Sequence, residues 1–340
     1  MIEYKGASIQ ELFFKKIKEE ADENPYLIQN EFAPSEEETL KTIFLKPFSE
    51  TINTYQFKHD VDLELNVLFQ LSRKIHEDDA LGETHEGIVT HLKNSSRHPN
   101  IKEGDLFIVR FSDIMFGGAP VDGLGIFKVE KKDAFIETPD WTKEPTLLFK
   151  EGIGEKKLDK ACVILFTEEP YTILAYDNNS SEAVYWKNDF INLDFKRDHV
   201  NDTNHFLQMT KTYITEQMPE EFEVSKTDQI DLLNKSIKYF KEAETFDKGE
   251  FELSVFGQED EAINSFRFFD KQYQDEMDLE VSDNFKIAAN SVKKQARIFK
   301  SVLKLDKNFH VYIHGNRELI ERGQDSDGRK YYKIYYENES

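Results

Sequence analysis

The sequence feature that most constrains the fold is a change of hydrophobic period near Asn100. Before it, apolar residues recur at helical spacing, as in Leu63–Ile75, where one face of a helix would be buried. After it come short runs rich in β-branched and aromatic residues, which are typical of antiparallel strands joined by turns. The pattern predicts a mainly antiparallel sheet of about five or six strands. The runs are Leu106–Phe111, Gly125–Val129, Ala134–Glu137, Ala161–Phe166, Tyr171–Tyr176 and Val184–Trp186.

Helical segments are expected on both sides of this strand-rich region. Ser8–Glu20 is amphipathic, with Ser8 as its cap, and Ile88–Lys93 belongs to a helix that ends before Pro99. An acidic break at Pro219 marks the expected domain boundary. The sequence therefore predicts an α+β protein with an N-terminal α+β domain, 1–217, and a smaller α+β domain, 218–340. Helices are expected at Thr203–Gln217, Thr227–Ala243 and Gln258–Gln272, and strands at Phe309–His314 and Lys330–Tyr336.

Charge is distributed unevenly along the 340 residues, whose formal net charge is −22. Residues 216–280 hold 19 acidic and 7 basic side chains, a net −12, whereas residues 284–317 hold 8 basic side chains and 1 acidic, a net +7. Because nucleic-acid surfaces carry clustered Lys and Arg that displace counterions from phosphates, any DNA contact must be local. The sign reversal indicates where such a contact would lie.

The basic stretch is expected to be helical from about Ser291. Lys293, Arg297, Lys300 and Lys304 would then fall on one face, beside an apolar stripe that includes Val292 and Phe299. Two interpretations stay open. In the first, the cations form a solvated helix face, and the aliphatic parts of the lysine side chains cover the edge of the core. In the second, the cations contact DNA phosphates. The aromatic residues of the two C-terminal strands likewise either pack within a sheet or stack on unpaired bases.

Four closely spaced blocks carry a family resemblance. They are His91–Ile101, Asp122–Lys128 with Glu130–Lys132, Gly152–Lys160 and Asp177–Phe190. In order and spacing they resemble the bacterial nucleoid-associated protein family of the NdpA/YejK type, and flanking segments extend the resemblance over nearly the whole chain. The resemblance implies a cytoplasmic protein of the nucleoid that binds double-stranded DNA without reading its sequence. It brings no catalytic residues and no cofactor.

The resemblance favours phosphate contact by the basic stretch and by the lysines of the third block. The candidate DNA-binding residues are Lys293, Lys294, Arg297, Lys300, Lys304, Lys307, Lys156, Lys157 and Lys160. The alternative is an acidic interaction protein that binds DNA-processing enzymes rather than DNA, using its carboxylates as a phosphate-like array. A homo-oligomer is compatible with either function.

Enzymatic motifs are weak in this sequence. Asp122, Glu130 and Lys132 resemble the carboxylate-and-lysine pattern of metal-dependent nucleases, but a charged hairpin produces this short pattern often. His85, His91 and His98 lack the i, i+4 spacing of a helical zinc site, so no metal site is expected. Gly152–Lys157 lacks the spacing of a phosphate-binding loop. We therefore expect no enzyme.

Cellular context follows from two further observations. Cys162 is the single cysteine, in an apolar run, so a buried thiol in a reducing cytoplasm is expected. No apolar run approaches the roughly 20 residues that a membrane-spanning helix needs, so no membrane contact is expected.

Overall fold

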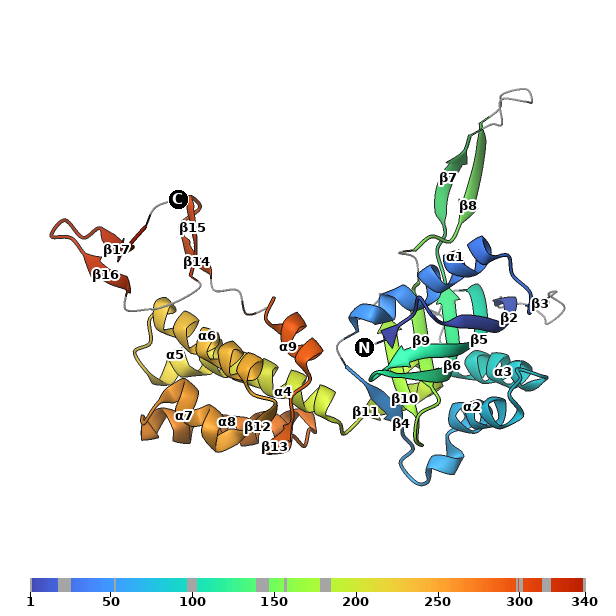
Figure 1. The fold of residues 1–340 in the computed structure, drawn as a ribbon, viewed down its shortest axis with the longest axis horizontal. Helices are drawn as coiled ribbons and strands as arrows, with labels where there is room; N and C mark the ends of the chain where they lie inside the picture. Colours follow the sequence, from blue (N-terminus) through green and yellow to red (C-terminus); the bar gives the residue numbers. More distant parts are fainter. Residues whose placement is uncertain are drawn as a thin grey trace. The chain divides into compact units, whose positions relative to one another are not determined.

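The computed structural model describes residues 2–17, 26–51, 53–96, 103–138, 147–155, 158–177, 185–297, 299, 302–313 and 319–338. The chain divides into two compact units, Met1–Lys196 and Arg197–Ser340, and each has its own hydrophobic core (Figure 1). This division lies earlier than the predicted boundary at 217/218. The reason is that helix α4 (His199–Thr212) buries Phe206 and Leu207 in the core of the second unit.

The first unit is built on a nine-stranded sheet whose strand pairs are all antiparallel, in the order β11-β4-β10-β9-β6-β5-β2-β3, with β1 beside β5. The sheet is larger than predicted because strands before residue 60 and after residue 190 join it. Its strands are β1 (Ile2–Glu3), β2 (Ser8–Ile17), β3 (Tyr26–Gln29), β4 (Tyr55–Phe57), β5 (Gly104–Phe116), β6 (Ala119–Val129), β9 (Lys160–Leu165), β10 (Thr172–Asp177) and β11 (Leu193–Phe195).

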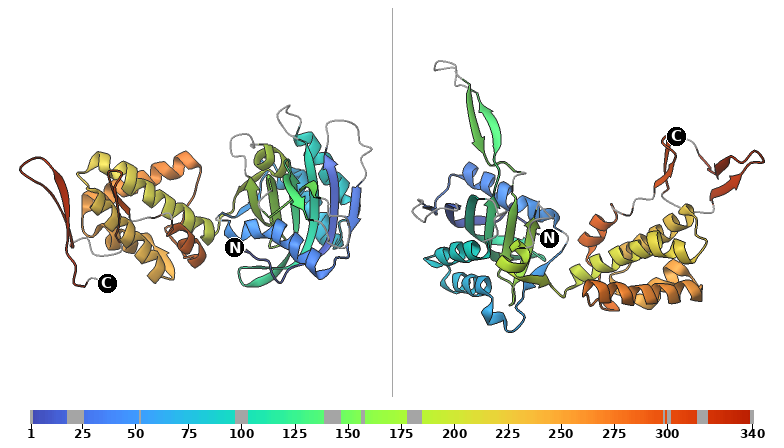
Figure 2. Two further views of the ribbon diagram at one scale, coloured as in Figure 1. Left: turned by 90° about the horizontal axis from the view of Figure 1, so that it is seen from above. Right: turned by 180° about the vertical axis from the view of Figure 1, so that it is seen from behind.

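Helices cover both faces of this sheet (Figure 2). Helix α1 (Pro34–Leu45) and the 3-10 helix η1 (Lys46–Glu50) pack on one face, where Phe44 meets Phe127 of β6. Helices α2 (Val67–Asp78) and α3 (Thr84–Ser95) cover the other face. Because successive residues of a strand point to opposite faces, each central strand buries side chains in both layers. Cys162 is fully buried on β9, as predicted.

Several predicted elements of this unit are confirmed. Leu63–Ile75 comprises the 3-10 helix η2 (Leu63–Leu65) and most of α2, and Ile88–Lys93 lies within α3. Gly117 and Gly118 form the turn between β5 and β6, where both have positive φ, a conformation that glycine adopts without a steric cost.

Two predictions for this unit are wrong. Ser8–Glu20 is not a helix: residues 8–17 form β2, and Leu12 and Phe13 are buried on opposite faces of the sheet. The strands on its two sides, β3 and β5, satisfy the backbone hydrogen bonds of β2, and this pairing overrides the helical pattern of the sequence. Tyr185 and Trp186 begin the π-helix η3 (Tyr185–Ile191) instead of continuing a strand. Residues 18–20 and Val184 lie outside the described residues.

The strands Asp133–Glu137 (β7) and Leu148–Gly152 (β8) form a separate antiparallel hairpin. Each pairs with the other and with no other described strand. The sequence predicted β7 but not β8.

The second unit is a helical core followed by small hairpins. Phe206 lies at its centre, with ring centroids 4.3 Å from Phe246, 5.0 Å from Phe251 and 6.0 Å from Phe266. No described helix is long and apolar enough to cross a membrane. The other elements are η4 (Tyr213–Gln217), α5 (Met218–Glu221), α6 (Lys226–Glu242), β12 (Thr245–Asp247), α7 (Lys248–Phe256), α8 (Asp260–Met277), β13 (Asn284–Lys286), α9 (Ala289–Gln295), β14 (Val302–Leu305), β15 (Phe309–Tyr312), β16 (Ile320–Gln324) and β17 (Lys330–Ile334).

The two units confirm the predicted α+β class, with a mainly antiparallel sheet as its largest element. The predicted order of helices first and strands afterwards is not followed, because β1, β2 and β3 precede α1.

Candidate nucleic-acid interface

The predicted basic helix is much shorter in the structure. Helix α9 ends at Gln295, and Val302–Leu305 is strand β14, so Lys293 and Lys304 do not share a helix face. The reason is hydrophobic: Phe299 is buried in the aromatic core of the unit, whereas Leu303 is buried in a second cluster. One continuous helix would place both on a single stripe. Lys300 lies outside the described residues.

Residues 284–297 nevertheless form a segment of purely basic charge, with four cations and no carboxylate. We call it the α9 segment. Lys286, Lys293 and Arg297 are exposed, while Lys294 is half-buried. Buried Ser291, Val292 and Gln295 fix the other face of the helix against the core. The arrangement can therefore offer several cations to a polyanion from a firmly packed base.

The C-terminal hairpins add cations and aromatic rings. Lys304 of β14 and Lys307 of its turn are exposed, as are Phe309 and Tyr312 of β15. On the inner side, Leu303 packs with Ile230 of α6. The rings of Phe309 and Tyr312 thus lie largely outside the core, whereas Tyr331 covers Gly323 on the paired strand and Tyr332 packs on the cluster of Leu303, as packing within a sheet predicts. Tyr331, Tyr335 and Tyr336 are likewise exposed. Exposed rings beside cations have the composition that stacks on nucleic-acid bases.

Lys160 is not on a surface. It lies on β9, 3% exposed, with Nζ 3.3 Å from Oδ1 of Asp177 and 5.3 Å from the ring centroid of Tyr185. A lysine held in this way cannot reach a phosphate, so the prediction that Lys160 contacts DNA is wrong. The reason is that its strand is central in the sheet. Lys156 and Lys157 lie outside the described residues.

Lys160 belongs to a buried polar cluster at one end of the sheet. Lys128 of β6 lies directly opposite it and places Nζ 3.0 Å from Glu130 Oε1 and 3.4 Å from the hydroxyl of Tyr185. Burial lowers the pKa of Lys128, and the charge of Lys160 acts in the same direction, although Glu130 opposes both. Burial also raises the pKa of Tyr185, assisted by Glu130 and Asp177.

All four sequence blocks that carry the family resemblance meet at this end of the first unit. Asp159 accepts a hydrogen bond from the Glu130 backbone N–H at 2.6 Å, which joins the second and third blocks. His91 Nε2 donates to the Phe190 carbonyl at 2.8 Å, which joins the first and fourth. Burial lowers the pKa of His91, consistent with a neutral ring. The blocks thus converge on contacts that hold the fold together.

The nuclease-like pattern is not assembled. Asp122 and Glu130 are separated by 8 residues of mostly extended chain, about 25 Å at the rise of a β-strand, so they cannot share an ion. Glu130 pairs with Lys128, and Lys132 pairs with Asp105 at 2.6 Å.

The histidines do not form a metal site either. His85 Nδ1 contacts the Gly82 carbonyl, His91 is bonded to Phe190, and His98 is not among the described residues. Within the described part of the chain, no group of three or more His, Cys, Asp or Glu residues could hold a metal ion.

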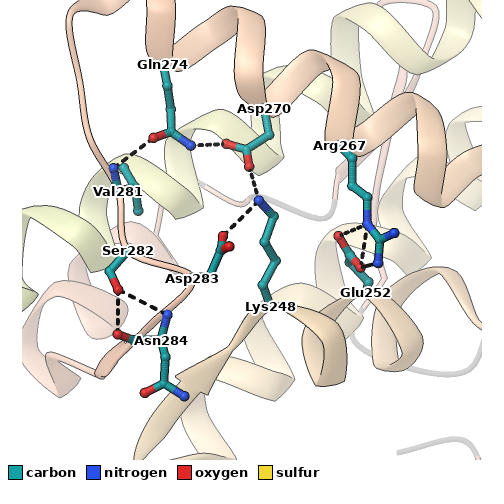
Figure 3. Close-up of polar contacts among 9 residues, drawn as sticks. All are labelled: Lys248, Glu252, Arg267, Asp270, Gln274, Val281, Ser282, Asp283 and Asn284. Atoms are coloured by element: carbon teal, nitrogen blue, oxygen red, sulfur yellow. Dashed lines mark hydrogen bonds and ion pairs between the residues drawn. The ribbon is translucent and has the colours of Figure 1, made fainter.

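The second unit also contains an acidic cavity that sequence reasoning missed, with a volume of about 770 Å³. Lys248 lies between Asp270, at 2.6 Å, and Asp283, at 2.9 Å, and Arg267 forms a two-point contact with buried Glu252 (Figure 3). Burial opposes the charge of Lys248, but hydrogen bonds to the two aspartates raise its pKa. With carboxylates in excess, this cavity would repel phosphate. The sequence signal that could have indicated this cavity is the acidic composition of residues 216–280.

Together these features define a two-unit α+β protein in which a basic segment stands out against an acidic chain. Residues 12–338 match the family described as nucleoid-associated protein YejK. The match covers nearly the whole chain, so the protein belongs to this family, and the predicted family is confirmed. No curated protein matches the chain.

Proposed function

We propose that this nucleoid-associated protein binds double-stranded DNA through exposed cations of its second unit. The observation that carries the proposal is the α9 segment, which has four cations and no carboxylate in a chain of net charge −22. Lys286, Lys293 and Arg297 are the principal phosphate contacts, and Lys304 and Lys307 extend them. Membership in a nucleoid-associated family supports this assignment.

Binding of this kind is independent of base sequence. Contacts to phosphates set position and affinity but carry no sequence information. Helix α9 has seven residues and buries three of them, which leaves little surface for reading base edges in a groove. We therefore expect similar affinity for unrelated duplexes and a steep fall in affinity with added salt.

The decisive variant reverses three exposed charges: Lys286→Glu, Lys293→Glu and Arg297→Glu. Affinity for fluorescent duplexes is measured by anisotropy at several salt concentrations. The slope of log affinity against log salt should flatten by close to three units, because each lost phosphate contact removes about 0.9. The fold should persist, since exposed charges contribute about 0–1 kcal/mol each.

A matched control carries the same change in net charge elsewhere in the unit. Lys226, Lys238 and Lys241 are exposed on α6, and their triple replacement by Glu should retain most of the affinity. Equal loss in both variants would mean that overall charge, not the α9 segment, governs binding. Undiminished binding by the α9 variant would reject the site.

The alternative function is an acidic protein that binds DNA-processing enzymes. The carboxylate-rich cavity around Asp270 and Asp283 is the observation that favours it. Under this function the parent protein binds no DNA at low salt but retains a basic protein partner, and that retention weakens as salt is added. Direct binding to purified DNA in the absence of any partner distinguishes the two.

The proposed role is non-enzymatic. The buried lysines of the first unit pair with carboxylates, Lys128 with Glu130 and Lys160 with Asp177. Incubation of supercoiled plasmid with the protein and Mg²⁺ tests this, and we expect no nicking. Nicking by the parent that Asp122→Asn abolishes, at an exposed carboxylate of the nuclease-like pattern, would show that the pattern is active.

A further inference from the structure

The hairpin β7–β8 exposes apolar side chains. Cross-strand pairing places Ile136 opposite Phe149, and these two are 53% and 78% exposed. Phe135, Leu147 and Leu148 are also exposed, and Figure 1 shows the hairpin projecting away from the large sheet. An isolated two-stranded hairpin is marginally stable in water, and a clustered apolar patch marks an interaction site. We call residues 133–138 and 147–152 the arm.

The same unit has an open apolar pocket of about 630 Å³ between α1 and the end of the sheet. Ser35 and Thr39 lie at its rim, on α1. Strand β3, which forms one wall, is the last strand of the sheet, so one of its edges pairs with no other described strand. No arm residue lines the pocket. Its apolar lining consists of Leu12, Phe14, Leu27, Phe32, Leu40 and Phe107.

We propose that the arm of one copy of this protein fills the pocket of a second copy, and the reverse, in a two-fold symmetric dimer. The base of the arm adjoins its own pocket: Asp105 lines the pocket, and its carboxylate lies 2.6 Å from Nζ of Lys132, the residue before β7. Because arm and pocket are neighbours on each copy, a single two-fold axis beside them places the arm of each copy in the pocket of the other.

The surface available sets the strength of such a dimer. Each arm presents on the order of 500 Å² of apolar side chain, given roughly 150–250 Å² for a large aromatic residue. Alternation along the hairpin places Ile136 and Phe149 on one face, and only one face of each arm can enter a pocket. The two arms and two pockets therefore bury on the order of 1,000 Å², the low end for a specific interface, so the dimer should be weak. The net charge of −22 opposes association, so added salt should strengthen the dimer, whereas it weakens DNA binding.

A disulfide between two different single-cysteine variants tests the contact itself. Phe149→Cys and Thr39→Cys proteins are mixed and oxidised under native conditions, where Cys162 is fully buried and does not compete. We expect a linked species with the mass of two chains from this mixture. Replacing Phe149→Cys by Val61→Cys, at an exposed apolar residue outside the arm, should give little of it. No linked species from the first mixture would overturn the proposal, as would an internal disulfide alone in the Phe149→Cys/Thr39→Cys double variant.

Sedimentation velocity tests the reciprocal geometry. The parent chain should dimerise, while the arm variant Ile136→Asp/Phe149→Asp and the pocket variant Thr39→Arg should each be monomeric. Mixing the two variants should restore a weaker dimer, because one intact arm still meets one intact pocket. The control Val61→Asp/Phe268→Asp, at two exposed sites outside both surfaces, should dimerise like the parent. A monomeric parent, or a dimeric arm variant, would overturn the proposal.

Discussion

At the scale of single residues, burial determines what each charged side chain can do. Lys128 and Lys160 lie opposite each other on adjacent strands, and each is compensated by a carboxylate, Glu130 or Asp177. Their side chains are 1% and 4% exposed. Removal of one partner of a buried pair leaves an uncompensated charge, whereas replacement of both by apolar residues removes the problem.

Single and double variants of the buried pair should therefore differ strongly in stability. Glu130→Gln should lower the free energy of unfolding by about 3–5 kcal/mol, while Lys128→Met/Glu130→Met should cost far less. Urea denaturation measures both. Glu242→Gln, which breaks the exposed pair between Lys238 and Glu242, serves as control and should change stability by less than about 1 kcal/mol. A double variant as unstable as the single one would contradict the account.

A second residue-scale prediction concerns Asp202 of α4. Burial, with a smaller contribution from the charge of Asp198, raises the pKa of Asp202 from 3.8 to about 6. Between these pH values the folded state holds a proton that the unfolded state has released, so stability falls as the pH rises through this window.

Asp202→Asn should therefore stabilise the second unit at pH values above 6 and have little effect below the ordinary pKa of the carboxyl. We expect about 1 kcal/mol, because Asp202 is partly exposed and its charge is favourable near the start of a helix. Thermal unfolding on both sides of the window provides the measurement. A stabilisation equal at all pH values would exclude this titration as its cause.

At the scale of elements, helix α2 depends on one buried side chain that links it to the rest of the unit. Asn66 Oδ1 accepts a hydrogen bond from the Phe69 N–H at 2.9 Å and caps the helix. Its Nδ2 donates to the carbonyl oxygens of Lys58, at 2.9 Å, and Ile191, at 3.1 Å. The same residue therefore satisfies a helix end and the carbonyls of two residues, Lys58 and Ile191, that lie far apart in the sequence.

Asn66→Ala should cost about 2–4 kcal/mol, combining a lost cap with buried carbonyls left unpaired. Asn66→Asp keeps the acceptor but faces the carbonyls with a carboxylate, so it should not restore stability. Asn66→Ser keeps a cap and should recover about 1 kcal/mol. Chemical denaturation ranks the three, and an Asp variant as stable as the parent would show that the Nδ2 contacts contribute nothing.

At the scale of the whole molecule, two cores of different composition divide the chain. The first surrounds a sheet, and the second is an aromatic cluster of helices. The residues proposed to contact DNA all belong to the second unit. Arm and pocket both belong to the first.

Separate fragments should therefore fold and should divide the functions. Residues 197–340 should retain DNA binding, while residues 1–196 should bind none yet dimerise. Cooperative thermal unfolding of each fragment shows folding, and anisotropy with sedimentation velocity assigns the functions. DNA binding by 1–196 at the same salt concentration would contradict the assignment of the site.

The sequence by itself determined the features that depend on local pattern. Short runs rich in β-branched and apolar residues, such as Ala161–Phe166, became central strands, and Thr227–Ala243 became α6, because residue type and helical spacing act within a single segment. The segregation of charge along the chain also followed from the sequence, and it led to the α9 segment. The hydrophobic patterns were enough for the α+β class, and the four sequence blocks were enough for the family resemblance.

Tertiary structure decided what depends on distant partners. Ser8–Ile17 became a strand because β3 and β5 complete its hydrogen bonds from sequence-distant segments. Lys160 is not a DNA-contact residue because it is buried and pairs with Asp177 on the neighbouring strand. The basic helix ended at Gln295 because Phe299 and Leu303 are buried in different clusters. Period and charge describe one segment at a time, whereas burial depends on which segments meet.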